Sequence, residues 1–162
     1  MARSSNKLNL VSDSAMVSGA KRLYEAIRKN APYKKIKDAV FISRVEGRGN
    51  SRFITVSINT NPATGGAPYA RAFDTGSGLH GKYKRKYIIT PRNFPLLQFR
   101  GTNQFAGKII RVAQVEHPGV KGTGYVKTSI EESRQSIRAE IAQNVKSNLR
   151  LYLKAQFESL GK

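Results

Sequence analysis

Apolar residues recur at helical spacing near the N-terminal end of the chain. Their spacing of three or four residues predicts an amphipathic helix over residues 13–29. The apolar positions are Met16, Ala20, Leu23 and Ile27. Pro32 follows the predicted end, where a helix stop is expected. Residues 1–11 are mostly polar, so we expect a flexible N-terminal arm there.

A longer apolar series marks a second helix, predicted from residue 125 or 129 to residue 160. We interpret the series as one continuous stripe formed by Ile130, Ile137, Ile141, Val145, Leu149, Leu153, Phe157 and Leu160. Such a helix is roughly 45–50 Å long, whereas an ordinary strand spans about 17–20 Å. Two alternatives follow. Either the last turns meet another subunit, or the N-terminal helix covers them.

Between the helices, β-branched and aromatic residues predict strands in pairs. Residues 39–45 and 53–58 flank a glycine-rich turn and predict a hairpin, in which Ile54, Val56 and Ile58 alternate toward the core. The alternation of apolar and polar side chains is typical of a strand with one buried face.

Two further runs, 96–99 and 108–115, predict a second hairpin, and residues 68–73 predict a short helix. The predicted fold class is therefore α+β. It comprises a mainly antiparallel four-stranded sheet of two β-hairpins, packed with an N-terminal helix and a long C-terminal helix, plus an extended basic loop or arm. We expect residues 12–162 to form a single domain, because 162 residues fit one core.

Composition excludes several classes of protein. A hydrophobic content of 39% and a charged content of 24% are typical of folded globular chains. No run of 18 apolar residues is present, so no membrane-spanning helix is predicted. The chain has no cysteine and therefore no disulfide or thiolate metal site.

Charge changes the picture most. The chain contains 29 Lys and Arg against 10 Asp and Glu, which leaves +19. A field of this size favours a polyanion or a strongly acidic protein as partner. The alternative is a basic surface that only solvates the protein.

The charge is concentrated in residues 79–95, where cations alternate with aromatic side chains and are followed by Pro91 and Pro95. We predict an extended basic arm or loop here. It either contacts phosphates, whose charge Lys and Arg neutralise, or lies across a neighbouring subunit. A long irregular segment in a compact domain points to a function.

Residues suited to catalysis are scattered. His117 lies beside Glu116, but adjacent strand residues point to opposite faces, and no further ligands stand at metal-binding spacing. Residues 119–124 contain three glycines without the Lys-Ser/Thr ending of a phosphate-binding loop. We therefore predict a protein without catalytic residues, cofactor or metal. An enzyme built around His117 and Glu116 is the minor alternative.

Several short motifs resemble, in order, those of a family of small tailed-bacteriophage morphogenesis proteins. These are the neck, head–tail joining or tail-completion proteins, including minor tail components. The resemblance covers about residues 12–160. The motif residues are Tyr69, Phe73, Thr75, Gly76, His117, Pro118, Gly119 and Tyr125. The family often has Glu before Phe-Gly-Thr, whereas this chain reads Phe-Asp-Thr-Gly at 73–76.

The resemblance implies a structural protein of the virion neck or tail, present in the host cytoplasm during assembly. It implies a cyclic homo-oligomer around the DNA passage, with six-fold symmetry preferred to twelve-fold. The implied neighbours are head-closure or connector proteins and tail-terminator or tail-tube proteins, with double-stranded DNA in the channel and no membrane. Subunit contacts are expected from Tyr83, Tyr87, Ile88, Leu153, Phe157 and Leu160.

The competing hypothesis is a basic nucleic-acid-binding module that forms no ring. Both hypotheses use the same cations, which would contact DNA or an acidic partner. These are Lys34, Lys35, Arg48, Lys82, Lys84, Arg85, Lys86 and Arg92. Lys37 and Arg52 are further candidates for phosphate contacts under the second hypothesis.

Overall fold

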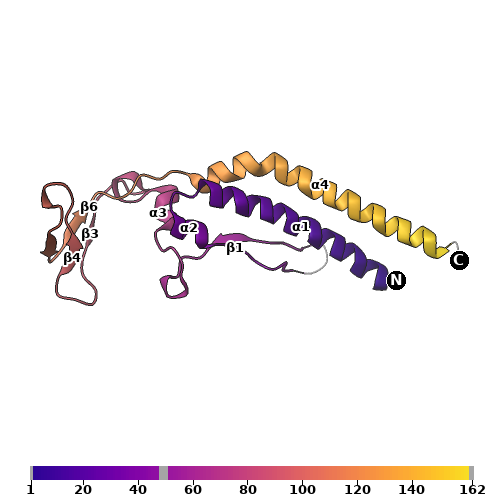
Figure 1. Cartoon of the computed structure of the whole chain (residues 1–162), viewed down its shortest axis with the longest axis horizontal. Helices are drawn as coiled ribbons and strands as arrows, with labels where there is room; N and C mark the ends of the chain where they lie inside the picture. Colours follow the sequence, from indigo (N-terminus) through magenta and orange to yellow (C-terminus); the bar gives the residue numbers. More distant parts are fainter. Residues whose placement is uncertain (1, 48–50, 161–162) are drawn as a thin grey trace. The chain divides into compact units, whose positions relative to one another are not determined.

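The chain divides into two compact units (Figure 1). The computed structural model describes residues 2–47 and 51–160, and side chains of 12–47 and 51–158. Unit 1 comprises Met1–Ala70 and Tyr125–Lys162, and unit 2 comprises Arg71–Gly124. The single domain expected over residues 12–162 stays a prediction, and within it the contacts of the chain group into these two units. The segment between the strands of unit 1 and the C-terminal helix makes most of its contacts within itself.

Unit 1 is built on two long antiparallel helices, α1 (Ala2–Asn30) and α4 (Tyr125–Leu160). Figure 1 shows the N- and C-termini at the same end of this pair. The long C-terminal helix is confirmed, with the earlier of the two predicted starts. The first helix begins at Ala2, so the described residues 2–11 are helical where a flexible arm was expected. Polar composition alone did not reveal that α4 offers a partner helix of comparable length.

Small side chains hold the two helices together. Ser129 is fully buried, and its hydroxyl lies 2.6 Å from the carbonyl oxygen of Tyr125 and accepts a hydrogen bond from Asn30 Nδ2 at 3.1 Å. A Cβ atom on Gly19 would lie 2.7 Å from Ile141 Cδ1. Farther along, the Arg22 guanidinium pairs with Glu140 at 3.0 Å. The helices approach closely because few large side chains separate them.

The apolar series of α4 does not form one buried stripe. Ile137 and Ile141 are half-buried, but Val145, Leu149, Leu153 and Phe157 are exposed. Each step of four residues advances about 400° around a helix, about 40° more than a full turn. Five such steps from Ile137 to Phe157 rotate the series by about 200°, so it winds away from α1. The half-buried positions beyond Ile141 are Asn144, Asn148, Tyr152 and Gln156.

The rest of unit 1 packs against the helices. The helix α2 (Lys34–Asp38) places Ile36 in the core with no exposed surface, and β1 (Val40–Ile42) pairs with β2 (Val56–Ile58). This confirms the first predicted hairpin. Ile54 and Val56 line a small apolar gap of about 210 Å³ together with residues of α1 and α4, as their alternation predicted. The loop between β2 and α3 includes the 3-10 helix Pro62–Thr64.

Unit 2 begins within α3 (Ala70–Thr75) and contains two separate two-stranded antiparallel sheets. The strand β4 (Leu97–Arg100) pairs with β5 (Ile109–Val112), which confirms the second predicted hairpin. The strand β3 (Tyr87–Ile89) pairs with β6 (Val115–His117). Two 3-10 helices complete the unit, Gly78–His80 and Asn103–Phe105.

The expected four-stranded sheet is wrong: the described strands form three two-stranded sheets. The predicted strand over 108–115 is interrupted at Ala113 and Gln114, and the two parts take different partners. The segment 79–95, predicted to be an extended arm, contains β3. Its partner lies some thirty residues later, a separation that local sequence patterns do not report.

Candidate functional site

Two motif segments distant in the sequence pack against each other in unit 2. The Ser77 N–H donates to Val120 O at 2.8 Å, and the Leu79 N–H donates to Pro118 O at 2.7 Å. Gly119 has a φ of 97°, and a Cβ there would lie 2.0 Å from Ser77 O, so only glycine fits without rearrangement. The motif residues Gly76, Pro118 and Gly119 are thus brought together as structural elements of one loop cluster.

His117 forms a hydrogen bond within this loop cluster. Its Nδ1 accepts a hydrogen bond from the Gly119 N–H at 2.9 Å, and its ring lies 5.3 Å from that of Tyr87. Its neighbour Glu116 pairs with Lys86 at 3.1 Å. Among the described side chains, no group of three His, Asp or Glu is placed to hold a metal ion.

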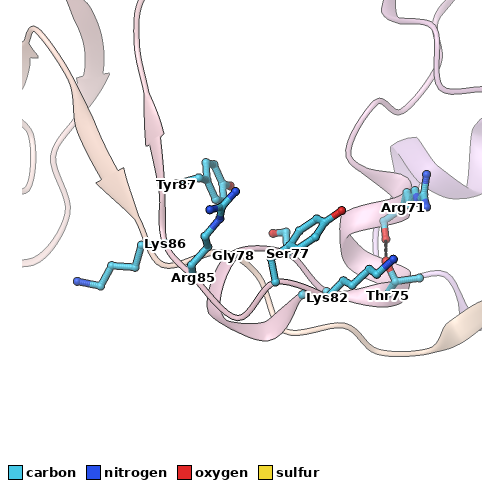
Figure 2. Close-up of a pocket in the computed structure, with 11 residues that line it drawn as sticks. Arg71, Thr75, Ser77, Gly78, Lys82, Arg85, Lys86 and Tyr87 are labelled. Carbon is cyan, nitrogen blue, oxygen red and sulfur yellow. Dashed lines mark hydrogen bonds between the residues drawn. The ribbon is translucent and has the colours of Figure 1, made fainter.

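The loop cluster borders an open cavity of about 510 Å³ that we call the basic pocket (Figure 2). Four cationic side chains line it: Arg71 from α3, and Lys82, Arg85 and Lys86 from the segment that precedes β3. Three glycines and two tyrosines share the lining, Gly76, Gly78, Gly81, Tyr83 and Tyr87. Figure 2 shows Lys86 pointing away from the other labelled side chains, which agrees with its pairing to Glu116.

Two of these cations, Lys82 and Arg85, form cation–π contacts with the ring of Tyr83. Lys82 Nζ and Arg85 Cζ each lie 5.8 Å from the centre of its ring, although the residue is 74% exposed. Lys84 between them has a φ of 47°, a left-handed conformation that is uncommon outside glycine. Its N–H donates to Gly81 O at 3.2 Å and closes a tight turn. The turn brings residues 82 and 85 to the same aromatic ring.

The charge around the basic pocket is strongly one-sided. Unit 2 contains ten Lys and Arg residues against two acidic residues, Asp74 and Glu116. The 41 residues between those two contain eight cations and no carboxylate side chain. Repulsion among the cations is therefore offset by few local partners, and an external polyanion would be attracted.

The basic pocket contains part of the predicted set of cations. Lys82, Arg85 and Lys86 line it, and Arg71 joins them without having been predicted. Lys84 lies in the same turn. The signal for Arg71 was weak, because it stands alone on α3, eleven residues before the basic run begins at Lys82.

The other predicted cations lie elsewhere. Lys34 and Lys35 belong to α2 of unit 1, and Arg48 lies outside the described residues. Arg52 forms a partly buried ion pair with Asp13, which disfavours its expected role as a phosphate contact. Arg92 lines a second cavity in unit 2, an apolar groove of about 730 Å³ that also contains Phe94 and Leu97.

The predicted subunit contacts are largely exposed. Ile88 of β3 and Phe157 of α4 are 61% and 71% exposed, and Tyr83, Tyr87 and Leu153 are exposed as well. The side chain of Leu160 lies outside the described part of the chain. The hairpin β4–β5 adds Phe99 and Ile109 to this exposed apolar surface. A two-stranded hairpin in water is marginally stable without a further packing partner.

The accessible surface area of the whole chain is also larger than expected of a globular protein. It amounts to 12623 Å², whereas a globular protein of this size exposes about 8,000 Å². Even two separate globules the size of the two units would expose about 9,600 Å² together. The chain therefore buries much less surface than its length allows.

None of the described helices is both long and apolar enough to cross a bilayer. Comparisons with protein-family models, curated proteins and solved structures found no match to this chain.

Proposed function

We propose that this protein is a structural component of a bacteriophage neck or tail-completion assembly, in which copies form a closed ring around the DNA passage. The observation that supports it most is the set of large apolar side chains exposed on both units, among them Ile88 and Phe157, in a chain whose total accessible area of 12623 Å² exceeds the roughly 8,000 Å² of a globular protein of its size. Contacts between copies would bury that surface. A repeated head-to-tail contact that closes by rotation produces a ring.

Charge gives the proposed ring its second property. Copies that each carry +19 repel one another, so assembly requires counter-ions or a polyanion. Double-stranded DNA in the channel would supply this negative charge, and acidic rings above and below would do so too. The proposed location is the virion neck or tail, after assembly in the host cytoplasm. The motif resemblance at residues 69–76 and 115–125 favours this setting.

A specific observation favours the second candidate function. The basic pocket is a concave cluster of cations, as expected of a nucleic-acid-binding module that needs no ring. The two candidates differ in oligomeric state, and the same preparation tests both.

The test for the ring uses the exposed apolar series at the end of α4. Negative-stain images and mass photometry of the full chain, with and without duplex DNA, should show one closed particle size. The double variant Leu153→Ser/Phe157→Ser should abolish it, because these side chains lie on the surface we expect to be covered. Leu151→Ser is the matched control, since Leu151 is 66% exposed and outside the series. Rings that persist unchanged in the double variant would exclude this contact, and particles that are monomeric under all conditions would exclude the ring.

A further inference from the structure

We infer that the basic pocket is a binding site for the phosphodiester backbone of duplex DNA, in which Arg71, Lys82 and Arg85 contact phosphates and Tyr83 is a positioning residue. The inference deepens the proposed function, because it rests on DNA passing the assembled protein. It adds the site, the part of the nucleic acid that is read, and the division of roles among neighbouring cations.

Lys86 is less available to a ligand than Lys82 and Arg85 are. Lys86 is held by Glu116 at 3.1 Å and points away from the other labelled side chains in Figure 2. The nearest acidic residues in the sequence flank a 41-residue stretch that has none. Lys82 and Arg85 instead lie over the Tyr83 ring. Their positive charge is oriented by the ring without being neutralised by it.

Tyr83 orients Lys82 and Arg85 before a ligand binds. Long cationic side chains lose conformational freedom when they bind, which weakens the contact. Tyr83 reduces this loss, because its ring attracts both Lys82 Nζ and Arg85 Cζ at 5.8 Å. The left-handed turn at Lys84 sets the backbone for this arrangement. An uncommon conformation of a non-glycine residue next to charged side chains is a feature that functional sites often contain.

The residues that line the basic pocket indicate which class of ligand it fits. Lysine is depleted in the centres of protein–protein interfaces, whereas phosphate contacts are made largely by Lys and Arg. The basic pocket contains Lys82 with two guanidinium groups, those of Arg71 and Arg85. Large apolar anchors for a protein partner lie in a different cavity, the groove with Phe94 and Leu97. These features favour a phosphodiester polyanion over an acidic protein.

We expect the basic pocket to contact the backbone of the DNA and not its bases. Lys82 and Arg85 both lie over the Tyr83 ring, so an unpaired base that stacked on the same face would compete with them. Contacts to phosphates position a protein on DNA and carry no sequence information. Binding should therefore tolerate any sequence and should be as strong for a duplex as for a single strand or stronger.

The experiment measures fluorescence anisotropy of labelled 20-base-pair duplexes of two unrelated sequences, bound by the full chain over a series of NaCl concentrations. The double variant Lys82→Gln/Arg85→Gln should weaken binding to both duplexes about tenfold or more. It should also reduce the slope of log affinity against log salt by about two, because each lost phosphate contact removes about 0.9 from that slope. Lys108→Gln is the matched control and should have little effect, since Lys108 is an exposed cation of the same unit that does not line the basic pocket.

Two variants of Tyr83 test whether this residue positions the cations or only supports the fold. Tyr83→Phe keeps the ring and should bind like the unaltered protein. Tyr83→Leu should weaken binding about two- to fivefold, the loss expected when an exposed cation–π contact disappears. The salt slope of Tyr83→Leu should stay unchanged, because the cations remain. Tyr83 is 74% exposed, so circular dichroism should show both variants folded.

Three results would overturn the inference. A loss for Lys108→Gln equal to that of Lys82→Gln made as a single variant would show an undirected charge field without a built site. Displacement of DNA by polyglutamate at matched charge as readily as by unlabelled DNA would assign the pocket to an acidic protein. Unaltered binding by the double variant would place DNA elsewhere. Its failure is distinguishable from failure of the ring: rings without DNA binding at this pocket contradict only the inference, and DNA binding by a strict monomer contradicts only the ring.

Discussion

The two units of this chain are stabilised in different ways. The buried apolar side chains of unit 1 include Ile27, Ile36, Val40 and Tyr125. Every residue of unit 2 is described, and none of its apolar side chains is buried; its one buried residue is Gly101. Unit 2 holds its shape through short strand pairs and loop hydrogen bonds, and one stretch of 41 residues carries eight cations and no carboxylate side chain. The comparison indicates that the buried core lies in unit 1 and that unit 2 has no core of its own; we propose that partners complete unit 2.

The largest expected effect tests where the core lies. Ile36→Ala should lower the free energy of unfolding by about 2–5 kcal/mol, because it leaves a cavity at a fully buried position. Ile88→Ala in β3 should change it by less than about 0.5 kcal/mol, because that side chain is largely exposed. Urea denaturation of both variants measures the difference. A cost of similar size at the two positions would contradict the assignment of the core to unit 1.

A smaller effect is expected at the contact between the two long helices. Gly19→Leu should destabilise unit 1 by about 1–3 kcal/mol, because its Cβ alone would already approach Ile141 Cδ1 to 2.7 Å. Combining it with Ile141→Ala should recover part of the loss, since the second change removes the obstructing atoms. A double variant whose cost equals the sum of the two single costs would show that Gly19 and Ile141 do not meet.

The smallest expected effect is local to unit 2. His117→Ala removes the acceptor for the Gly119 N–H, a hydrogen bond worth about 1 kcal/mol. Amide exchange at Gly119 should therefore accelerate about fivefold, while the unfolding midpoint of unit 1 stays unchanged. His80→Ala is the control, because the His80 side chain is exposed. A shift of the global midpoint in His117→Ala would show that the loop cluster supports both units.

Local patterns predicted much of the fold, and long-range partners accounted for most of the errors. The helix to Leu160, the first hairpin and the pair β4–β5 followed from periodicity and turn residues within short windows. The pairing of β3 with β6 joins distant segments and was missed. The apolar series of α4 was interpreted as one face because the rotation of about 40° per four residues was not taken into account.

The candidate site shows the same limit. The alternation of Lys, Arg and Tyr identified residues 82–86 as a cationic cluster, but sequence could not tell which cation is already paired. Lys86 is neutralised by Glu116, thirty residues away, and Arg52 by Asp13, thirty-nine residues away. Arg71 joins the pocket from α3. Each assignment depends on a tertiary contact between segments that carry no shared motif.

The central claim is that copies of this chain cover one another's exposed apolar surface and form a closed ring. Native mass spectrometry of the full chain, with and without duplex DNA, tests it most directly. We predict a single dominant species at a fixed multiple of 18.0 kDa, with six-fold preferred to twelve-fold. A monomer at every protein and salt concentration, with or without DNA, would contradict it.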